Sequence, residues 1–376
     1  MSEAAQEVFE NAIALQGRGD ITMALSYFRK ALELAPQDTE IAYHTASALL
    51  QNGQLEEAQS QLRRIVFTDP NHLKARASLA NCQLLIDDLD NAKTNFSEVL
   101  AQTPDNKNAL YGLASVLLKE NNPVEASVPA KILQNLLPDN TAVLTLFAET
   151  QAKTGQIEPA VALYRKALKE DPDHVPAMLG LAQTLLMRKQ FKDVIELAVT
   201  AAQLSPQDPL PLEMLSVALE GLGELEDAQE ACFEAAKLAP NSSQYLTRLS
   251  ILSRKLGDHV NSIKYALNAH DSADEPIGAL KALGAALAAL KYSNEARKVL
   301  TDISSNCGLD PVIREFAETL IIEKTKSDIN DRHSSEAVPT PNEKNDSINE
   351  HPTPTVSAPD DDLMPNVLGL HRQDKS

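Results

Sequence analysis

Tryptophan is absent from this chain of 376 residues, and aromatic residues of all kinds make up only 4% of it. Strands are rich in aromatic and β-branched residues, whereas alanine and leucine, which recur throughout this sequence, favour helices. Hydrophobic residues still reach 43%, so the chain is able to bury a large core. The composition therefore predicts an all-α protein.

Positive charge is also scarce in the sequence. Lys and Arg number 34 against 53 Asp and Glu, which gives a formal net charge of -19 at pH 7. A field of that sign repels phosphate backbones, so nucleic-acid binding is not expected. The sequence also lacks an apolar run of about 18 residues and a basic N-terminal leader, which argues against membrane insertion and export. We therefore expect a soluble, cytoplasmic protein.

Motifs that carry chemistry are missing as well. The three cysteines, Cys82, Cys232 and Cys307, lie far apart without CxxC spacing, which favours buried thiols over a metal site. The sequence has no glycine-rich phosphate loop, no GxSxG elbow and no HExxH pair of metal ligands. It therefore predicts no cofactor, no metal and no enzyme activity.

Prolines, by contrast, recur at a fixed interval. They stand 34 residues apart at Pro36, Pro70, Pro104, Pro138, Pro172, Pro206 and Pro240. A constant period of this length is typical of solenoids built from helix-turn-helix units. Units can be laid over one another from Ala5 onward, and the ninth begins at Ile277. Each repeated proline is expected to end the second helix of its unit, because it pushes the preceding residue out of helical geometry.

Small side chains occupy two positions of nearly every unit. The eighth position holds Ala12, Ala46, Ala80, Ala114, Ala148, Ala182, Ser216, Ser250 and Gly284. The twentieth holds Ala24, Ala58, Ala92, Ala126, Ala160, Val194, Ala228, Ser262 and Ala296. Small residues allow two helices to approach closely, so we expect these positions to face each other across the pair.

The residues that link the helices predict tight turns and caps. The turn position holds Gly19, Gly53, Asp87, Asn121, Gly155, Lys189, Gly223, Gly257 and Lys291. Glycine and asparagine suit a left-handed residue that ends a helix, whereas Lys189 and Lys291 need a costlier conformation or another turn. N-caps are expected at Asp38, His72, Asn106, Asn140, His174 and Asp208, so the two histidines there are predicted caps, not metal ligands. Pro129, inside a second helix, predicts a kink or a change of helix stacking.

These features together resemble the tetratricopeptide repeat. The resemblance covers about residues 5–310 in nine repeats, and it departs from the family pattern at position four, where Val8, Ala42 and Arg76 replace Trp or Leu. It implies a right-handed α-solenoid superhelix of antiparallel helix pairs. Residues 311–325 restart a helix, with Asp310 as cap and Pro311 in the first turn, and predict a capping helix over the open end of the stack.

The last part of the chain has a different composition. Residues 326–376 are rich in Pro, Ser, Thr, Asn and acidic residues, which predicts a disordered tail. Near its end an acidic run precedes an apolar motif made of Leu363, Met364, Val367, Leu368 and Leu370. Short apolar motifs in such tails often order on a partner. The motif is therefore a docking handle, a segment that folds back into the protein's own groove, or an ordinary chain end.

The family resemblance also implies a function. In tetratricopeptide proteins the first helices line a concave groove that binds peptides, which implies a non-enzymatic scaffold or adaptor with protein partners. The most binding-like positions lie in the second to fourth units and are Tyr43, Lys74, Asn81, Asn108, Tyr111 and Ser115. Aromatic rings offer area at low entropic cost, and asparagine offers a donor and an acceptor to a peptide backbone. The alternative for Tyr43 and Tyr111 is packing against adjacent helices.

A second function remains open from the sequence. The chain could instead be an accessory chaperone or subunit of an enzyme or of a secretion or assembly machine, and dock through its tail. Deletion of residues 326–376 distinguishes the roles of the tail, since loss of partner capture supports docking and a gain supports autoinhibition.

Overall fold

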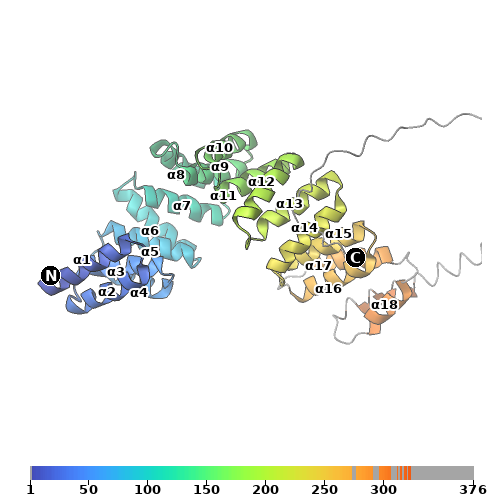
Figure 1. Cartoon of the computed structure of the whole chain (residues 1–376), viewed down its shortest axis with the longest axis horizontal. Coiled ribbons are helices and arrows are strands. Elements are labelled where there is room, and N and C mark those ends of the chain that lie inside the picture. Colours follow the sequence, from blue (N-terminus) through green and yellow to red (C-terminus); the bar gives the residue numbers. More distant parts are fainter. Residues whose placement is uncertain are drawn as a thin grey trace, which may run out of the picture. The chain divides into compact units, whose positions relative to one another are not determined.

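The structure, a computed structural model, describes residues 2–272, 277–290, 296–305, 311, 314–315, 317–319 and 321–322. The regular elements within these ranges are helices, and no strand occurs among them (Figure 1). The predicted all-α fold is therefore confirmed.

The helices follow one another in pairs joined by short turns. They are α1 (Glu3–Gly17), α2 (Ile21–Leu34), α3 (Thr39–Gln51), α4 (Leu55–Thr68), α5 (Leu73–Leu85), α6 (Leu89–Gln102), α7 (Lys107–Lys119), α8 (Pro123–Leu136), α9 (Thr141–Lys153), α10 (Ile157–Glu170), α11 (Val175–Met187), α12 (Phe191–Leu204), α13 (Leu210–Leu222), α14 (Leu225–Leu238), α15 (Ser243–Lys255), α16 (His259–Asp271), α17 (Ile277–Leu290) and α18 (Ala296–Ser305).

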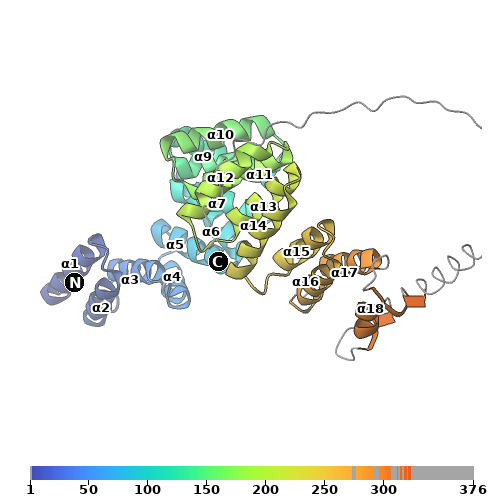
Figure 2. The ribbon, with the colours of Figure 1, turned by 45° about the vertical axis from the view of Figure 1, so that its right-hand side comes forward.

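The helix pairs keep the predicted register. We number the repeats by their helices, so that repeat 1 is α1 and α2 and repeat 9 is α17 and α18. The first helices of repeats 2 to 5 begin 34 residues apart, at Thr39, Leu73, Lys107 and Thr141. The chain divides into two compact units, Met1–Leu197 and Ala198–Ser376. In the second unit, α16 lies beside both α15 and α17 (Figure 2).

The two small positions of each unit bring the helices of a pair together. Ala80 and Ala92, at these positions in repeat 3, are completely buried. In repeat 7 the hydroxyl of Ser216 donates to the carbonyl oxygen of Ala228 at 2.7 Å, which joins the eighth and twentieth positions directly. The predicted contact is confirmed, and this buried hydroxyl has the partner that burial requires.

Successive repeats interlock through a ring and a glycine. The ring of Phe96 on α6 is completely buried, and a Cβ added to Gly112 on α7 would lie 2.1 Å from it. Tyr164 on α10 and Gly180 on α11 repeat the arrangement, with the added Cβ at 2.4 Å. Each of these glycines is therefore required by the close approach of a ring from the preceding repeat.

The turn inside each described pair uses a left-handed residue, as predicted. Gly53 has φ 74°, and the non-glycine residues Asp87, Asn121 and Lys189 have φ 64°, 56° and 57°. Lys189 therefore takes the costlier conformation rather than a different turn. Lys291 lies outside the described residues.

Polar side chains cap several first helices at the predicted positions. Nδ1 of His72 accepts a hydrogen bond from the backbone N–H of Ala75 at 3.1 Å, and Oδ1 of Asn106 accepts one from Ala109 at 3.0 Å. The interpretation of His72 as a cap is confirmed.

His174 occupies the predicted N-cap position of α11, but its side chain makes no capping hydrogen bond. The next residue but one, Pro176, has no N–H to offer, and the N–H of Ala177 bonds to the backbone carbonyl of His174 instead. Asp208 differs too: it accepts from the N–H of Leu210 at 2.9 Å, while Pro209 occupies the cap position of α13.

Proline acts differently at the end of a helix and inside one. Thr103, which precedes Pro104, has φ -134° and lies outside the helix, so the predicted helix end is confirmed. Pro129 is buried inside α8, yet the helix continues through it from Pro123 to Leu136. Without an N–H at Pro129, the carbonyl of Glu125 loses its helical donor. A bend at this point stays a prediction.

The last described residues belong to a core of their own. Leu283 on α17, Ile303 on α18 and Ala317 share one hydrophobic cluster with Ile263 on α16. The described residues between 311 and 322 are helical. The rest of the predicted capping helix, and the whole of the tail 326–376, lie outside the described residues.

Candidate partner-binding surface

The residues proposed from the sequence lie on three successive first helices. We call the set the candidate surface, and it consists of Tyr43 on α3, Lys74 and Asn81 on α5, and Asn108, Tyr111 and Ser115 on α7. Helix α5 contacts both α3 and α7. The repeat register therefore places these side chains on neighbouring helices although 72 positions separate the first from the last.

One hydrogen bond joins two of these helices across the candidate surface. The amide nitrogen of Asn81 donates to Oδ1 of Asn108 at 3.1 Å, in an exposed setting. Each amide keeps free hydrogen-bonding capacity, since one carbonyl oxygen and one NH₂ group are not used by this contact. The hydroxyl of Ser115 donates to the backbone carbonyl of Tyr111 at 2.9 Å, so that side chain is engaged by its own helix.

Tyr43 is held by two histidine rings. Its ring lies 5.5 Å from that of His44 in an edge-to-face arrangement and 5.3 Å from that of His72, measured between centroids. The side chain is half-buried, while neighbouring Lys74 is exposed. Packing against neighbouring side chains therefore accounts for the buried part of the Tyr43 ring.

His44 lies behind Tyr43 in an aromatic cluster. Its ring stacks on Phe28 at 6.0 Å and contacts Phe9 edge-on at 5.3 Å. Burial lowers the pKa of His44, and Lys74 lowers it further, whereas Glu40, with a carboxylate oxygen 3.7 Å away, raises it. The neutral imidazole is therefore the form that this cluster favours.

Tyr111 is the more accessible of the two tyrosines, because 40% of its surface is exposed. Partial burial, and secondly the carboxylate of Glu149, raises the pKa of its hydroxyl. The hydroxyl is thus a protonated group that can donate a hydrogen bond. Glu149 itself pairs with Lys153 at 3.0 Å.

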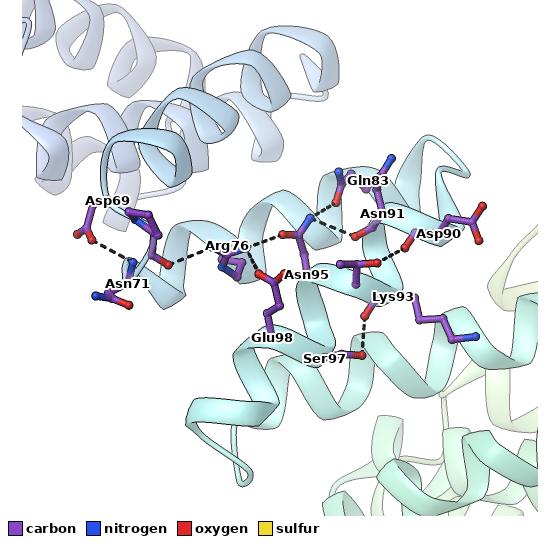
Figure 3. Close-up of polar contacts among 12 residues, drawn as sticks. Asp69, Asn71, Arg76, Gln83, Asp90, Asn91, Lys93, Asn95, Ser97 and Glu98 are labelled. Carbon is purple, nitrogen blue, oxygen red and sulfur yellow. Dashed lines mark hydrogen bonds and ion pairs between the residues drawn. The ribbon is translucent and has the colours of Figure 1, made fainter.

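A polar network that the sequence analysis missed joins the two helices of repeat 3 (Figure 3). Arg76 on α5 donates to Oδ1 of Asn95 on α6 at 3.1 Å and forms an ion pair with Glu98. The amide of Asn95 donates in turn to Oε1 of Gln83, a buried side chain, at 2.8 Å. A guanidinium of Arg76 also reaches the backbone carbonyl of Pro70 at 3.1 Å. The one feature of the sequence that could have indicated this network is Gln83, because the same position is leucine in most other units.

The second unit has a separate polar cluster on α13 and α15. The guanidinium of Arg248 donates to Glu220 at 2.5 Å and to the hydroxyl of Ser216 at 3.1 Å, and Lys255 donates to Glu220 at 2.6 Å. Every charged group here has a partner within the cluster. The cluster therefore serves to join the helices of neighbouring repeats.

The two described cysteines are buried and free, as predicted. Burial raises the pKa of the Cys232 thiol to about 12 and also raises that of Cys82. The reactive form of cysteine is the thiolate, so neither residue is suited to be a nucleophile near neutral pH. Cys307 lies outside the described residues.

The described ranges contain neither a metal-binding cluster nor a membrane-spanning helix. No group of three or more His, Cys, Asp and Glu residues is arranged there to hold a metal ion. None of the helices in those ranges combines the length and apolar character needed to cross a membrane. The apolar motif of the tail, made of Leu363, Met364, Val367, Leu368 and Leu370, lies outside the part of the chain that the structure describes.

Models of the tetratricopeptide repeat match residues 15–82 and 158–198, and a second such model matches residues 86–127. No curated protein matches the sequence. These matches fall on repeats whose turns and small positions were described above.

Solved structures share the fold at low identity. The structure of the APC/C hetero-tetramer Cut9-Hcn1 is similar with a TM-score of 0.60 and 16% identity over 74% of this chain and 55% of that one. A tetratricopeptide repeat protein from Parabacteroides merdae has a TM-score of 0.55 and 13% identity, covering 67% of this chain and 99% of that one. Yeast Tom70 has a TM-score of 0.52 and 18% identity, covering 84% and 67%.

The present chain thus spans only 55% of the Cut9-Hcn1 chain that it matches. At these low sequence identities, the similarity establishes the fold alone. The family models, the shared fold and the 34-residue register of helices, turns and small residues agree with one another. Residues 15–82, 86–127 and 158–198 therefore carry tetratricopeptide repeats, and the chain has the fold of tetratricopeptide-repeat structures.

Proposed function

We propose that this protein is a non-enzymatic scaffold that binds a segment of a partner protein across the candidate surface. The observation that carries the proposal is the hydrogen bond between Asn81 and Asn108, which holds two amides in register on neighbouring helices. Their remaining donor and acceptor groups match those of an extended peptide backbone, which offers both along its length.

Two tyrosines near the amide pair support the same proposal. Tyr43 lies on α3, next to the helix of Asn81, and Tyr111 lies on α7 with Asn108 and is 40% exposed. Rings that are already held in place lose little conformational entropy on binding, and such residues are frequent hot spots. The histidine contacts of Tyr43 therefore preorganise its ring as well as bury part of it.

The packing of the helices also supports a binding face on the first helices. In the first unit α3, α5, α7 and α9 each contact the next first helix along the chain. Among the second helices α2, α4, α6, α8 and α10 of that unit, no successive pair is in contact to the same extent. First helices that lie closer together than second helices give a stack that curves toward the first helices, which is the side a peptide groove requires.

The test is capture of partners from a lysate of the native source by the full chain and by a variant with Tyr43→Ala, Asn81→Ala and Tyr111→Ala. We expect the variant to lose at least one captured protein that the full chain retains. A matched control variant carries Phe67→Ala, Gln102→Ala and Phe233→Ala, which change exposed side chains of the same kinds on the second helices α4, α6 and α14. Circular dichroism checks that all three proteins have equal helicity.

Retention of every partner by the triple variant would contradict the proposal. Equal loss from both variants would contradict it too, because the effect would not be specific to the candidate surface. A partner lost only when residues 326–376 are deleted would favour the accessory role in which the chain docks through its tail.

A further inference from the structure

The first helices of the second unit keep the repeat register but not the chemistry of the candidate surface. Five repeats later, the two positions of the amide pair hold Ile251 on α15 and Gly278 on α17. The position of Tyr111 holds Lys281. An aliphatic residue, a glycine and a cation therefore replace the two amides and the exposed ring.

The ninth position of the first helices changes from polar to aliphatic between the two units. In repeats 2 to 6 it holds Ser47, Asn81, Ser115, Glu149 and Gln183, and in repeats 7 to 9 it holds Val217, Ile251 and Ala285. The three aliphatic residues are half-buried, as are most of the polar ones. The solenoid does not require an aliphatic residue at this position, since five successive repeats do without one.

Gly278 leaves open space next to these aliphatic residues. The register that brings Asn81 to Asn108 places Ile251 beside Gly278, since helices α15 and α17 are in contact. Within the part of the chain that the structure describes, a Cβ added to Gly278 would meet no atom of another helix within 4 Å. Ile251 is held in place from behind, because it packs against the cluster that contains Leu283. An aliphatic side chain of a partner can therefore contact Ile251 over the glycine.

Two cations on the same side of α15 and α17 have no carboxylate partner. Neither Arg254 on α15 nor Lys281 on α17 forms an ion pair with any described residue. The acidic residues of the neighbouring α13, Glu213 and Glu220, already accept hydrogen bonds from side chains of α15. The positive charge beside the aliphatic residues is therefore available to a carboxylate from outside.

We infer that repeats 7 to 9 carry a second binding surface, which takes a segment of a partner protein that has aliphatic side chains next to Asp or Glu. We call it the second-unit surface, and it consists of Val217, Ile251, Arg254, Gly278, Lys281 and Ala285. The aliphatic side chains of the segment lie against Ile251 and Ala285, and its carboxylates pair with the two cations. The second-unit surface shares no residue with the candidate surface, so it does not depend on the proposed function.

The test is the binding of labelled peptides to the full chain, measured by fluorescence anisotropy. The probe is a short peptide in which leucine and aspartate alternate. One comparison peptide has lysine in place of each aspartate, and the other has serine in place of each leucine. We expect the probe to bind at least tenfold more tightly than either comparison peptide, because only the probe offers both kinds of side chain.

Two substitutions of Gly278 test where the probe binds. Gly278→Glu places a carboxylate three residues before Lys281, so the cation gains a partner on its own helix. Gly278→Lys enters the same open space with the opposite charge. We expect Gly278→Glu to bind the probe at least tenfold more weakly than Gly278→Lys. Both replace an exposed helical glycine by a better helix former, so circular dichroism should show unchanged helicity for each.

The matched control is Lys264→Glu, which reverses the charge of an exposed lysine on the second helix α16. It is expected to leave the affinity for the probe unchanged. A loss of affinity equal to that of Gly278→Glu would show that overall charge decides the binding, and would overturn the proposal.

Four further outcomes would overturn it. Equal affinities for the three peptides would show no preference for the combined chemistry, and equal affinities of Gly278→Glu and Gly278→Lys would place the binding elsewhere. Probe binding that occurs only after deletion of residues 326–376 would assign the second-unit surface to the chain's own tail. A dimer that is detected by sedimentation and lost in Gly278→Glu would assign it to a second copy.

Discussion

Repeats 3 and 4 are neighbours in the first unit and solve the same packing problem with opposite chemistry. In repeat 3 the contact between the helices includes a polar network of Arg76, Gln83, Asn95 and Glu98. In repeat 4 the residues 34 positions later are Leu110, Leu117, Pro129 and Ile132. Each member of the polar network therefore has an apolar counterpart at the same place in the next repeat.

The same repeat backbone accommodates a polar or an apolar contact between its helices, but the two kinds of contact differ in what they require to be stable. Leu110 and Leu117 are 2% and 4% exposed. Their burial stabilises the helix pair of repeat 4, and this hydrophobic stabilisation does not depend on the direction of the side chains. The polar network must instead satisfy each buried donor and acceptor, and Nε of Arg76 is buried without a partner. We therefore expect repeat 3 to be the less stable of the two and to open first.

The largest effect is expected where the two repeats interlock. Phe96→Ala empties a buried site and should lower the free energy of unfolding by ~3–5 kcal/mol. Gly112→Leu forces a side chain into the Phe96 ring and should cost ~1–3 kcal/mol. The double variant should recover much of the loss, because it reproduces the pair found 34 residues later, Ala130 with Leu146. Urea denaturation followed by circular dichroism measures all three.

The control for this series is Phe67→Ala, because Phe67 is 89% exposed. Its effect should stay within about 0.5 kcal/mol. A double variant whose loss equals the sum of the single losses would show that the ring and the glycine are not coupled, and would contradict the interlock.

A second prediction tests the polar network itself. Arg76→Leu leaves Asn95, Glu98 and the carbonyl of Pro70 without their donor, and should destabilise the protein by ~1–3 kcal/mol. Replacing Arg76, Gln83 and Asn95 together by leucine should restore or exceed the original stability, because no buried polar group is then left unpaired. Denaturation midpoints of both variants, with Leu110→Ala in repeat 4 as a reference for apolar truncation, provide the measurement. A triple variant less stable than Arg76→Leu would contradict the prediction.

The same contrast explains what the sequence could predict. The 34-residue period, the close helix contact and the turn at Gly53 follow from residue types that each repeat needs, so they were visible in the sequence. The network of Arg76 was not, because it replaces apolar residues in one repeat only and depends on side-chain directions. The sequence placed His174 correctly at a cap position, but it did not show that the side chain makes no capping hydrogen bond there.

The candidate surface is a mixed case. The sequence proposed its residues from the register of the first helices, and Asn81 and Asn108 indeed meet. The contact of Tyr43 with His72 could not be foreseen, because His72 caps the first helix of the next repeat and the contact depends on the angle between repeats. Partner binding by these residues stays a prediction.

The third prediction concerns the caps of the two repeats. Helix α5 is capped by His72 and α7 by Asn106. Asparagine is a preferred N-cap residue, and its amide oxygen can accept the same hydrogen bond from the Ala75 amide. His72→Asn should therefore keep the cap, whereas His72→Ala should destabilise the protein by ~1 kcal/mol. Hydrogen exchange of the Ala75 amide, compared with that of Ala109, measures the effect. Equal protection of the Ala75 amide in the unmodified chain and in His72→Ala would contradict it.

The smallest effect is expected from His44, in the repeat before this pair. Burial lowers its pKa in the folded protein below the usual value of 6.5. As the pH falls, the unfolded chain therefore takes up the proton at His44 before the folded chain does. The neutral ring contributes its full stability above pH 6.5, and this contribution is lost as the pH falls through the pKa of the folded protein. Thermal unfolding between pH 7.5 and 5 should show a steeper acid decline for the unmodified chain than for His44→Gln. The difference should be modest, because Glu40 opposes the effect of burial. Parallel profiles for the two proteins would show that the aromatic cluster around His44 does not distinguish the neutral ring from the charged one.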